Sequence, residues 1–372
     1  ERGETMKKLK KLLLMTLVAT SLIACNKDTN TANAPKEEEK KEPEKIVYYT
    51  PLTHEERDNE EQAKKKIFAV MLDNHDDARP QAQISKADII YEYRVEGEFT
   101  RYMALFQSNF PENVGPVRSA RPYFVQTAKE YNAIYAHWGG SEAGLAEVRN
   151  RHVVDLDGIA LEGIVFHRNK DVGKRAPHNG YISLPELENY LVEKKQIDVN
   201  DNTASLNFYD KEANIEGLDV GEITLNFNQN YKTNFIYDEA SGKYKYIRQD
   251  KPVIDEATGE EFSTDNLVVL FQKGVVAGPK GTLKMANIGS GTGLLLQKGK
   301  LAPISWEKAN EDARTILKYP DGTEVKFYPG RTFFSIVDEE KDAVYQVPQA
   351  EGQEGQDSSA NTNAKAEDQA EK

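Results

Sequence analysis

The chain has 372 residues, of which 48 are Lys or Arg and 61 are Asp or Glu, for a net charge of −13 at pH 7. This acidity excludes a nucleic-acid-binding protein of the usual kind, because contact with the phosphate backbone depends on clustered basic side chains. The single cysteine excludes disulfide bonds within the chain and zinc sites built from several cysteines. Stability must come from buried apolar cores, and the length suffices for two domains of ordinary size.

The N-terminal segment has the pattern of a bacterial lipoprotein leader. A basic stretch follows Met6, and an apolar run over residues 12–23, too short to span a bilayer, leads into Ala24 and Cys25. We expect residues 1–24 to be a leader with its start at Met6, cleaved before a diacylglyceryl-modified cysteine. Loss of its five basic and two acidic side chains changes the net charge from −13 to −16. A buried free cysteine is the alternative, which the nearby lysines and the polar run that follows disfavour.

A lipid-modified Cys25 predicts an exported protein that is held at the outer face of the cell membrane by its lipid. Residues 25–60 are rich in Lys and Glu and are expected to form a flexible tether, with an apolar island at 46–52. A solvated helix within the Lys-Glu run is the alternative. Residues 346–372 form an acidic tail that we expect to be disordered, because no large apolar side chain after Gln349 offsets the entropy of ordering.

Residues 61–195 predict an α/β domain, because strand-like apolar runs alternate with segments of helical periodicity. Ser183 and Glu186 form a capping box at the start of the last helix. The expected strands cover residues 67–73, 89–95, 99–106 and 133–137. The expected helices cover residues 120–131, 142–150 and 184–191.

Residues 196–217 are polar and aperiodic and are expected to be a linker, and residues 218–345 predict a mostly β domain. The glycine-rich run 289–293 precedes a strand and no helix, which favours a β-turn over a dinucleotide-binding motif. The chain is therefore predicted to be of mixed α+β class, an N-terminal α/β domain followed by a mostly β C-terminal domain. The expected strands of the second domain cover residues 222–227, 234–237, 244–247, 267–276, 283–288, 294–298, 315–319, 324–328 and 332–337.

The segment 118–121 (Arg-Ser-Ala-Arg) is the first candidate binding site. Ser119 is expected to cap a helix, which places both arginines at the first helical turn, where free backbone N–H groups favour an anion and disfavour a cation. One hypothesis is a bound phosphate or carboxylate, held by the two guanidinium groups and the helix N-terminus. The other is internal pairing with carboxylates such as Asp73 or Glu92, which would make the arginines architectural.

Two histidines are the second candidate. His137 is expected at the carboxyl end of a strand, where α/β sheets gather ligands, and His178 lies in a loop beside Pro177, which limits its freedom. A merely solvated His178 is the alternative. Ser141 is expected to cap the following helix, because as a nucleophile it lacks the second glycine of the elbow motif. No histidine pair has the spacing of metal ligands on a helix, so neither a metal nor a cofactor is expected.

Four segments resemble the YerB-type lipoproteins of Gram-positive bacteria, and the arginine-containing one is specific. The resemblance covers about residues 61–345, more loosely in the C-terminal half. It implies an exported, lipid-anchored protein of two domains. Because the molecular function of that family is uncharacterised, it supplies no catalytic residues. The four segments are Lys86–Glu92, Thr100–Ala104, Gly115–Pro122 and His137–Ser141.

These features predict a non-enzymatic protein of the cell envelope that recognises an anionic glycan, a peptide carboxylate or a protein partner. The alternative is a cell-wall-directed hydrolase or transferase, with His137 or His178 as general base and the two arginines stabilising a developing anion. An enzyme requires these groups to converge on one reacting position, whereas a binding protein needs only a cationic surface. A purely structural partner of an envelope enzyme is a third hypothesis. The candidate anion-binding residues are Arg101, Arg118, Ser119, Arg121, His137, His178 and Asn179.

Overall fold

The start of the folded part differs from the prediction. The computed structural model describes residues 46–199, 202, 204–210 and 213–347, so Cys25, the leader and most of the predicted tail lie outside the described residues. Within the predicted tether, strand β1 (Tyr48–Tyr49) pairs with β2 (Glu56–Arg57), and Leu52 is fully buried. The end of the apolar island therefore belongs to the folded unit, because the burial of Leu52 offsets the entropy of ordering a short hairpin.

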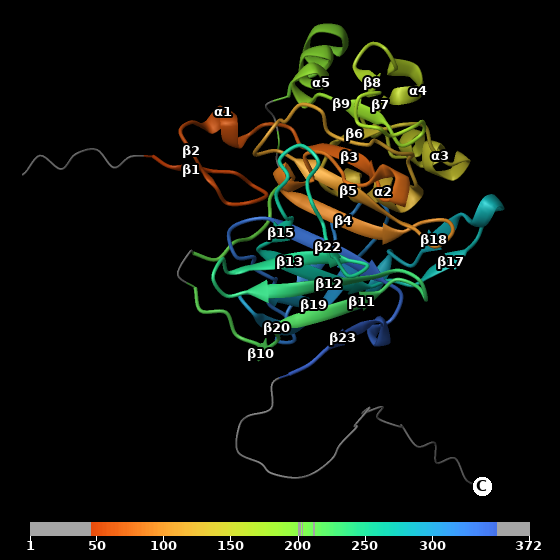
Figure 1. Ribbon diagram of the computed structural model, residues 1–372. Coiled ribbons are helices and arrows are strands. Elements are labelled where there is room, and N and C mark those ends of the chain that lie inside the picture. The colour runs from red at the N-terminus through yellow and green to blue at the C-terminus, as the bar shows by residue number, and fades with distance from the viewer. Residues whose placement is uncertain (1–45, 200–201, 203, 211–212, 348–372) are drawn as a thin grey trace, which may run out of the picture. The chain divides into compact units, whose positions relative to one another are not determined.

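An 11-stranded sheet forms the centre of the fold (Figure 1). Its strand β22 (Thr332–Val337) pairs in parallel with β4 (Ile89–Arg94) and with β16 (Asn266–Phe271), so strands from both predicted domains share one sheet. Beyond β4 the order is β5 (Thr100–Phe106), β3 (Phe68–Asp73), β6 (Ile134–His137) and β7 (Asp155–Asp157). Beyond β16 it is β19 (Gly289–Gln297), β20 (Lys300–Lys308) and β10 (Leu218–Asp219), with β21 (Ile316–Lys318) paired to β20.

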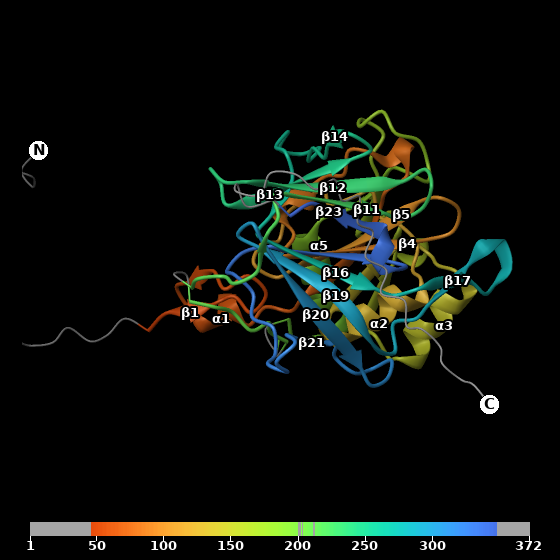
Figure 2. The same cartoon turned by 90° about the horizontal axis from the view of Figure 1, so that it is seen from below.

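A second, antiparallel sheet lies on one side of the central sheet, and two helices lie on the other (Figure 2). The second sheet has six strands, β14 (Lys251–Pro252), β13 (Lys243–Arg248), β12 (Lys232–Asp238), β11 (Glu222–Asn226) and β23 (Ala343–Tyr345), with β15 (Ser263–Thr264) paired to β13. The helices on the other side are α2 (Pro122–Glu130) and α3 (Glu142–Asn150).

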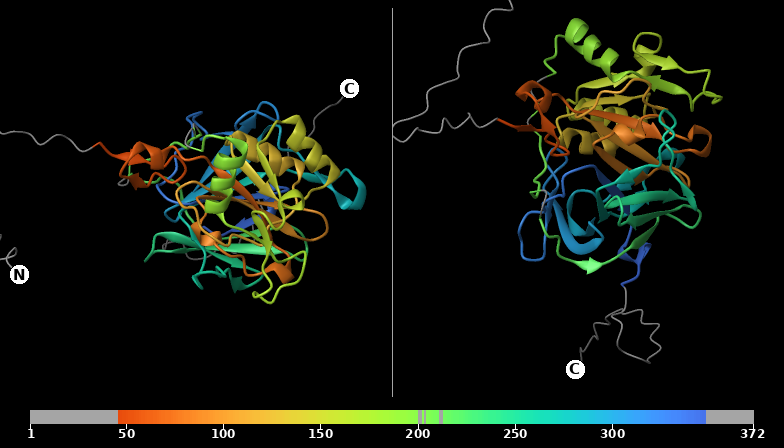
Figure 3. Two further views of the ribbon diagram at one scale, coloured as in Figure 1. Left: turned by 90° about the horizontal axis from the view of Figure 1, so that it is seen from above. Right: turned by 60° about the vertical axis from the view of Figure 1, so that its left-hand side comes forward.

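Smaller elements complete the fold. The hairpin of β8 (Phe166–Arg168) and β9 (Gly180–Ile182) lies with α5 (Leu184–Tyr190) at the end of the central sheet away from β10 (Figure 3). A π-helical turn, Leu191–Lys195, continues α5. Apart from short 3₁₀ turns, the remaining elements are α1 (Glu60–Ala63), α4 (Gly158–Leu161) and the hairpin of β17 (Gly274–Val276) and β18 (Leu283–Met285).

Each face of the central sheet carries a hydrophobic core. Along β3, Val70 and Leu72 belong to the core shared with the second sheet, whereas Ala69 and Met71 belong to the core that includes Phe124 of α2. This division follows from the alternation of side chains along a strand. Burial on both faces explains why β3 reads as a continuous apolar run.

The fold class is confirmed, and in the N-terminal part the expected strands and helices differ from the observed ones by two residues at most. Three predictions in the C-terminal part are wrong. The single strand expected over residues 267–276 is two strands in different sheets, β16 (Asn266–Phe271) and β17 (Gly274–Val276). The glycine-rich run forms no turn and instead opens strand β19, which pairs with β20. Its glycines serve close packing, because a Cβ on Gly291 would lie 2.6 Å from Trp306 Nε1. Residues 324–328 make only isolated bridges. Strand β20 is absent from the expected strands because Pro303 interrupts its apolar alternation.

A buried carboxyl precedes β4. Asp88 accepts hydrogen bonds from the backbone N–H groups of Gln107 (2.5 Å) and Ser108 (2.8 Å), which follow β5. Burial raises the pKa of Asp88 to about 6 in spite of these hydrogen bonds, which act in the opposite direction. The folded protein therefore binds this proton more tightly than the unfolded chain does.

This difference predicts a pH dependence of stability. Because the folded pKa lies above the ordinary value of 3.8, the stabilisation is fully present below about pH 4 and is lost as the pH rises through about 6. A shift of about two pKa units corresponds to about 3 kcal/mol. In Asp88→Asn, whose amide oxygen can still accept both hydrogen bonds, we expect the change in unfolding free energy between about pH 3.5 and pH 7.5 to differ from wild type by about that amount. Urea titrations at the two pH values measure it, and identical pH profiles would contradict it.

Candidate functional site

The candidate site is built where β3 ends. Asp73 is the last residue of β3, and Arg101 stands opposite it on the antiparallel strand β5. The segment after Gly115 runs beside β3, because the Asp73 N–H donates to the carbonyl of Pro116 (2.8 Å) and the Arg118 N–H donates to that of Met71 (2.9 Å). Extended backbone pairing thus brings Arg118 to the end of β3.

Asp73 connects one arginine with one histidine. Its side chain is 4% exposed. One carboxylate oxygen, Oδ2, accepts a hydrogen bond from His178 Nδ1 (2.7 Å) and lies 3.0 Å from Arg118 Nε, while Oδ1 accepts from the His75 N–H (3.1 Å). The Arg118 Nε–H has no hydrogen-bond acceptor, so it does not point at the carboxylate although the charges are in contact. Arg118 is therefore ion-paired and still holds an unused donor.

Arg121 has a closer partner. Its Nε and Nη2 donate to the two carboxylate oxygens of Glu96, at 2.6 and 2.7 Å. Partial burial alone would raise the pKa of Glu96, but the hydrogen bonds and charge of Arg121 outweigh it and hold that pKa below its ordinary value. This bidentate pair is the strong geometry for an arginine and a carboxylate, so Arg121 is engaged internally.

Arg101 is the arginine without a carboxylate. It is 6% exposed, its Nη1 donates to the carbonyl of Ser119 (2.8 Å), and its Nε has no hydrogen-bond partner. No carboxylate among the described residues lies within ion-pairing distance of it. Burial first, and then the neighbouring charges of Arg121 and Arg118, lower the pKa of Arg101 to about 10, so it stays cationic at neutral pH. Three guanidinium groups thus share two carboxylates, and the cluster carries an excess of positive charge.

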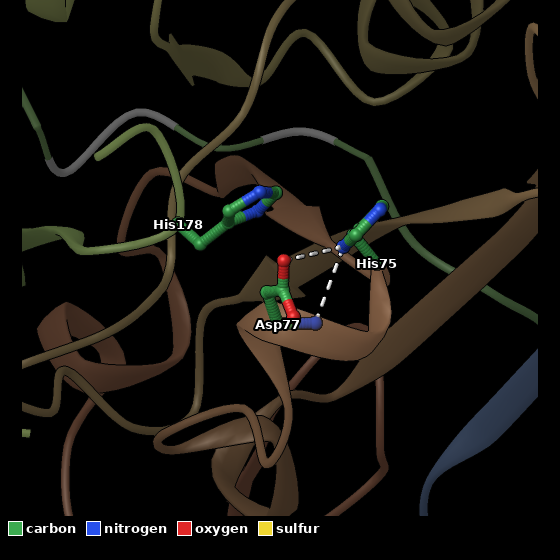
Figure 4. Close-up of side chains that lie close together, drawn as sticks. All are labelled: His75, Asp77 and His178. Atoms are coloured by element: carbon green, nitrogen blue, oxygen red, sulfur yellow. Dashed lines mark hydrogen bonds and ion pairs between the residues drawn. The ribbon is translucent and has the colours of Figure 1, made fainter. Parts of the chain in front are cut away.

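Figure 4 shows two histidine rings, those of His75 and His178, and both residues contact Asp73 of this cluster. The rings of His75 and His178 stack with centroids 4.6 Å apart. Together with Asp77 they offer metal-ligand atoms within 4.8 Å of one another, the one such group among the described residues. Asp77 is exposed, and Nδ1 of each ring already has a partner, the Asp77 N–H for His75 and Asp73 for His178. With the arginines so close, the charge of the surroundings favours an anion over a metal cation.

The other predicted residues make their contacts elsewhere. His137 is fully buried, with Nδ1 2.8 Å from the Gly139 carbonyl and Nε2 3.2 Å from Asp155 Oδ2, so neither ring nitrogen is available to a substrate as a general base. Asn179 is buried, and its Oδ1 accepts from Arg168 (3.4 Å).

Of the predicted helix caps Ser141 and Ser119, the first is confirmed and the second is wrong. Ser141 caps α3, because its Oγ accepts from the Gly144 N–H (3.0 Å). Ser119 caps no helix, since α2 begins at Pro122 and the Ser119 Oγ donates to the Trp138 carbonyl (3.0 Å). The reason is the proline at the first helical position, which fixes the helix start two residues later than expected.

Sequence reasoning missed two groups of the site. His75 follows β3 by two residues and Glu96 follows β4 by two, and both positions place polar side chains at the end of a strand. That placement was a usable signal, as it was for His137. Their contacts with residues more than twenty positions away depend on the order of strands in the sheet. The sequence around each residue does not specify that order, so these contacts could not be predicted.

Comparison with known proteins shows the family to which the chain belongs. The chain matches a two-part class of proteins, with the "Protein of unknown function (DUF3048) N-terminal domain" over residues 52–198 and the corresponding C-terminal domain over residues 223–334. It is 30% identical over 276 residues to the "Putative lipoprotein YerB" of Bacillus subtilis (strain 168), which covers 73% of this chain and 81% of that protein. The chain therefore belongs to the DUF3048 family, and the resemblance to YerB-type lipoproteins is confirmed.

The fold is shared with a solved structure of the same relative. The crystal structure of YerB protein from Bacillus subtilis superposes with a TM-score of 0.72 at 28% identity, and the match covers 80% of this chain and 99% of that one. In the described part of this chain, none of the helices has the length and apolar character needed to cross a bilayer.

Proposed function

We propose that this chain is an extracytoplasmic lipoprotein, anchored at the outer face of the membrane through Cys25, that binds an anionic group at its arginine cluster. The description of its relative as a lipoprotein supports the anchored location. The leader pattern that ends at Cys25 gives the same location independently.

The observation that carries the binding role is the unpaired Arg101. Asp73 attracts Arg101 without lying within ion-pairing distance, and a buried cation without an ion pair is costly, so a fold that retains one next to two further guanidinium groups has a use for it. The Nε–H groups of Arg101 and Arg118 both lack acceptors. A carboxylate or phosphate group bound beside the cluster supplies the missing negative charge. Such a group occurs on an envelope glycan, on a peptide or on a protein partner.

Inorganic phosphate is the simplest probe of this proposal. At constant ionic strength, phosphate at ten times its dissociation constant should stabilise the wild type by about 1.4 kcal/mol relative to chloride. Arg101→Met should lose this response, because it removes the unpaired charge while keeping an apolar stem. Arg149→Met, which removes an exposed arginine of α3, is the matched control and should respond as wild type does.

Thermal unfolding with and without phosphate gives the readout. Without phosphate, Arg101→Met should be at least as stable as wild type if the cation serves binding, since no ion pair is broken. The proposal fails if the wild type shows no response to phosphate or if Arg101→Met responds fully.

A further inference from the structure

A cavity of about 290 Å³ lies outside the arginine cluster and is lined by different types of side chain. It opens between the C-terminal end of α2 and the strands β4, β22, β16 and β21, and no residue of the arginine cluster lines it. The residues that line it come from both halves of the chain. Neither the family description nor the relatives assign any role to it.

Aromatic rings form one wall of the cavity. Tyr91 stacks on Phe334 with centroids 4.4 Å apart and planes at 11°, and Tyr131 and Phe327 lie within 6.3 Å of one or the other ring. All four line the cavity. Such a surface favours a ligand with a flat or ring-shaped apolar face.

The charged side chains that line the cavity form ion pairs with one another. Lys308 is 1% exposed and donates to Glu130 (2.6 Å), which also accepts from the backbone N–H and the hydroxyl of Thr315. Arg314 pairs with Glu324 at 3.3 Å. These four are the charged residues that line the cavity, so it presents no uncompensated charge and suits a neutral ligand.

One polar group of the wall is left without a partner. Gln272 lines the cavity, is 3% exposed, and its Oε1 accepts no hydrogen bond. A buried amide oxygen without a donor is destabilising, and among the described lining residues Gln272 Oε1 is the one buried side-chain acceptor without a partner. An O–H or N–H donor on a ligand would satisfy it.

We propose that this cavity is a second binding site, which takes a single neutral sugar ring. A sugar offers an apolar C–H face to the aromatic wall and hydroxyl donors to Gln272. The volume is close to the lower limit of about 300 Å³ for small-molecule pockets, so it admits one substituted six-membered ring and no chain of them.

Saturation-transfer NMR with N-acetylglucosamine tests this site directly. Glucuronate, a ring of similar size with a negative charge, is the comparison probe. The wild type should transfer saturation to N-acetylglucosamine. It should bind glucuronate at least about tenfold more weakly, because the described residues that line the cavity offer no unpaired cation. Equal binding of both probes, or no transfer to N-acetylglucosamine, would overturn the proposal.

Variants locate the binding and separate it from the arginine cluster. Gln272→Leu removes the unpartnered acceptor, and Val325→Phe fills the cavity from another wall, so each should weaken N-acetylglucosamine binding about tenfold. Gln107→Leu is the matched control, because Gln107 is also a buried glutamine with an unpartnered Oε1 but lies outside the cavity. Arg101→Met should leave this binding unchanged. Undiminished transfer in both Gln272→Leu and Val325→Phe would refute the site.

Discussion

The double variant Arg118→Gln, Arg121→Gln should lose about 3–5 kcal/mol of unfolding free energy. Asp73, at 4% exposure, would lose the cation beside it, and Glu96 would lose both of its bidentate hydrogen bonds. Removing one member of a buried ion pair is costly because the other charge stays buried. Relief of the repulsion on Arg101 offsets only part of this loss, because Arg118 and Arg121 are partly exposed and solvent screens their charges.

A matched surface pair is the control. Arg314 and Glu324 are 3.3 Å apart with side chains 45% and 40% exposed, so Arg314→Gln should cost less than about 1 kcal/mol. Adding Asp73→Asn to Arg118→Gln should recover part of the loss, because an amide no longer requires the cation. Urea unfolding followed by circular dichroism measures all of these. If the double variant loses no more than Arg314→Gln does, the two internal pairs open in solution and both arginines are free for a ligand.

These internal pairs show how far local sequence reasoning reaches. The arginine string stood out because two cations at a helix start need a counter-charge, and Asp73 was a correct candidate for one of them. Glu92, the other candidate, was wrong, because its carboxylate accepts from hydroxyl groups of buried side chains instead. The actual partner of Arg121 is Glu96, and its distance along the chain from Arg121 gives no hint of contact. The proposed ligand-facing role therefore rests on Arg101, whose lack of an ion-pairing carboxylate is visible only once the strand β5 is placed beside β3.

The same limit applies to the fold. Apolar runs and a correct cap at Ser141 were sufficient for the longer N-terminal elements, because burial on both sheet faces and capping are local properties. The pairing of β22 with β4 joins residues that are more than two hundred positions apart. No local pattern specifies that register, and a two-domain division drawn from composition does not reveal that both halves contribute to one sheet.

The largest expected effect is at the anchor, where Cys25→Ala should abolish lipid attachment completely. Cys25 lies outside the described residues, and the prediction rests on the leader pattern and on the lipoprotein description of the relative. The modification joins a diacylglyceryl group to the thiol, and the chain has no other cysteine that could accept it. Two acyl chains anchor a protein stably, whereas one gives only marginal binding, so the loss should be all-or-none.

Metabolic labelling with an alkyne-tagged fatty acid distinguishes the outcomes. Wild type and the control Thr29→Ala, a change four residues further along the predicted tether, should both carry the label. Intact-mass measurement should show that the labelled chain begins at Cys25, whereas Cys25→Ala should carry no lipid mass, because its side chain has no nucleophile for the transfer. Label that persists in Cys25→Ala would place the anchor elsewhere. The arginine cluster would then need another route to the envelope, since its binding role depends on meeting anions outside the membrane.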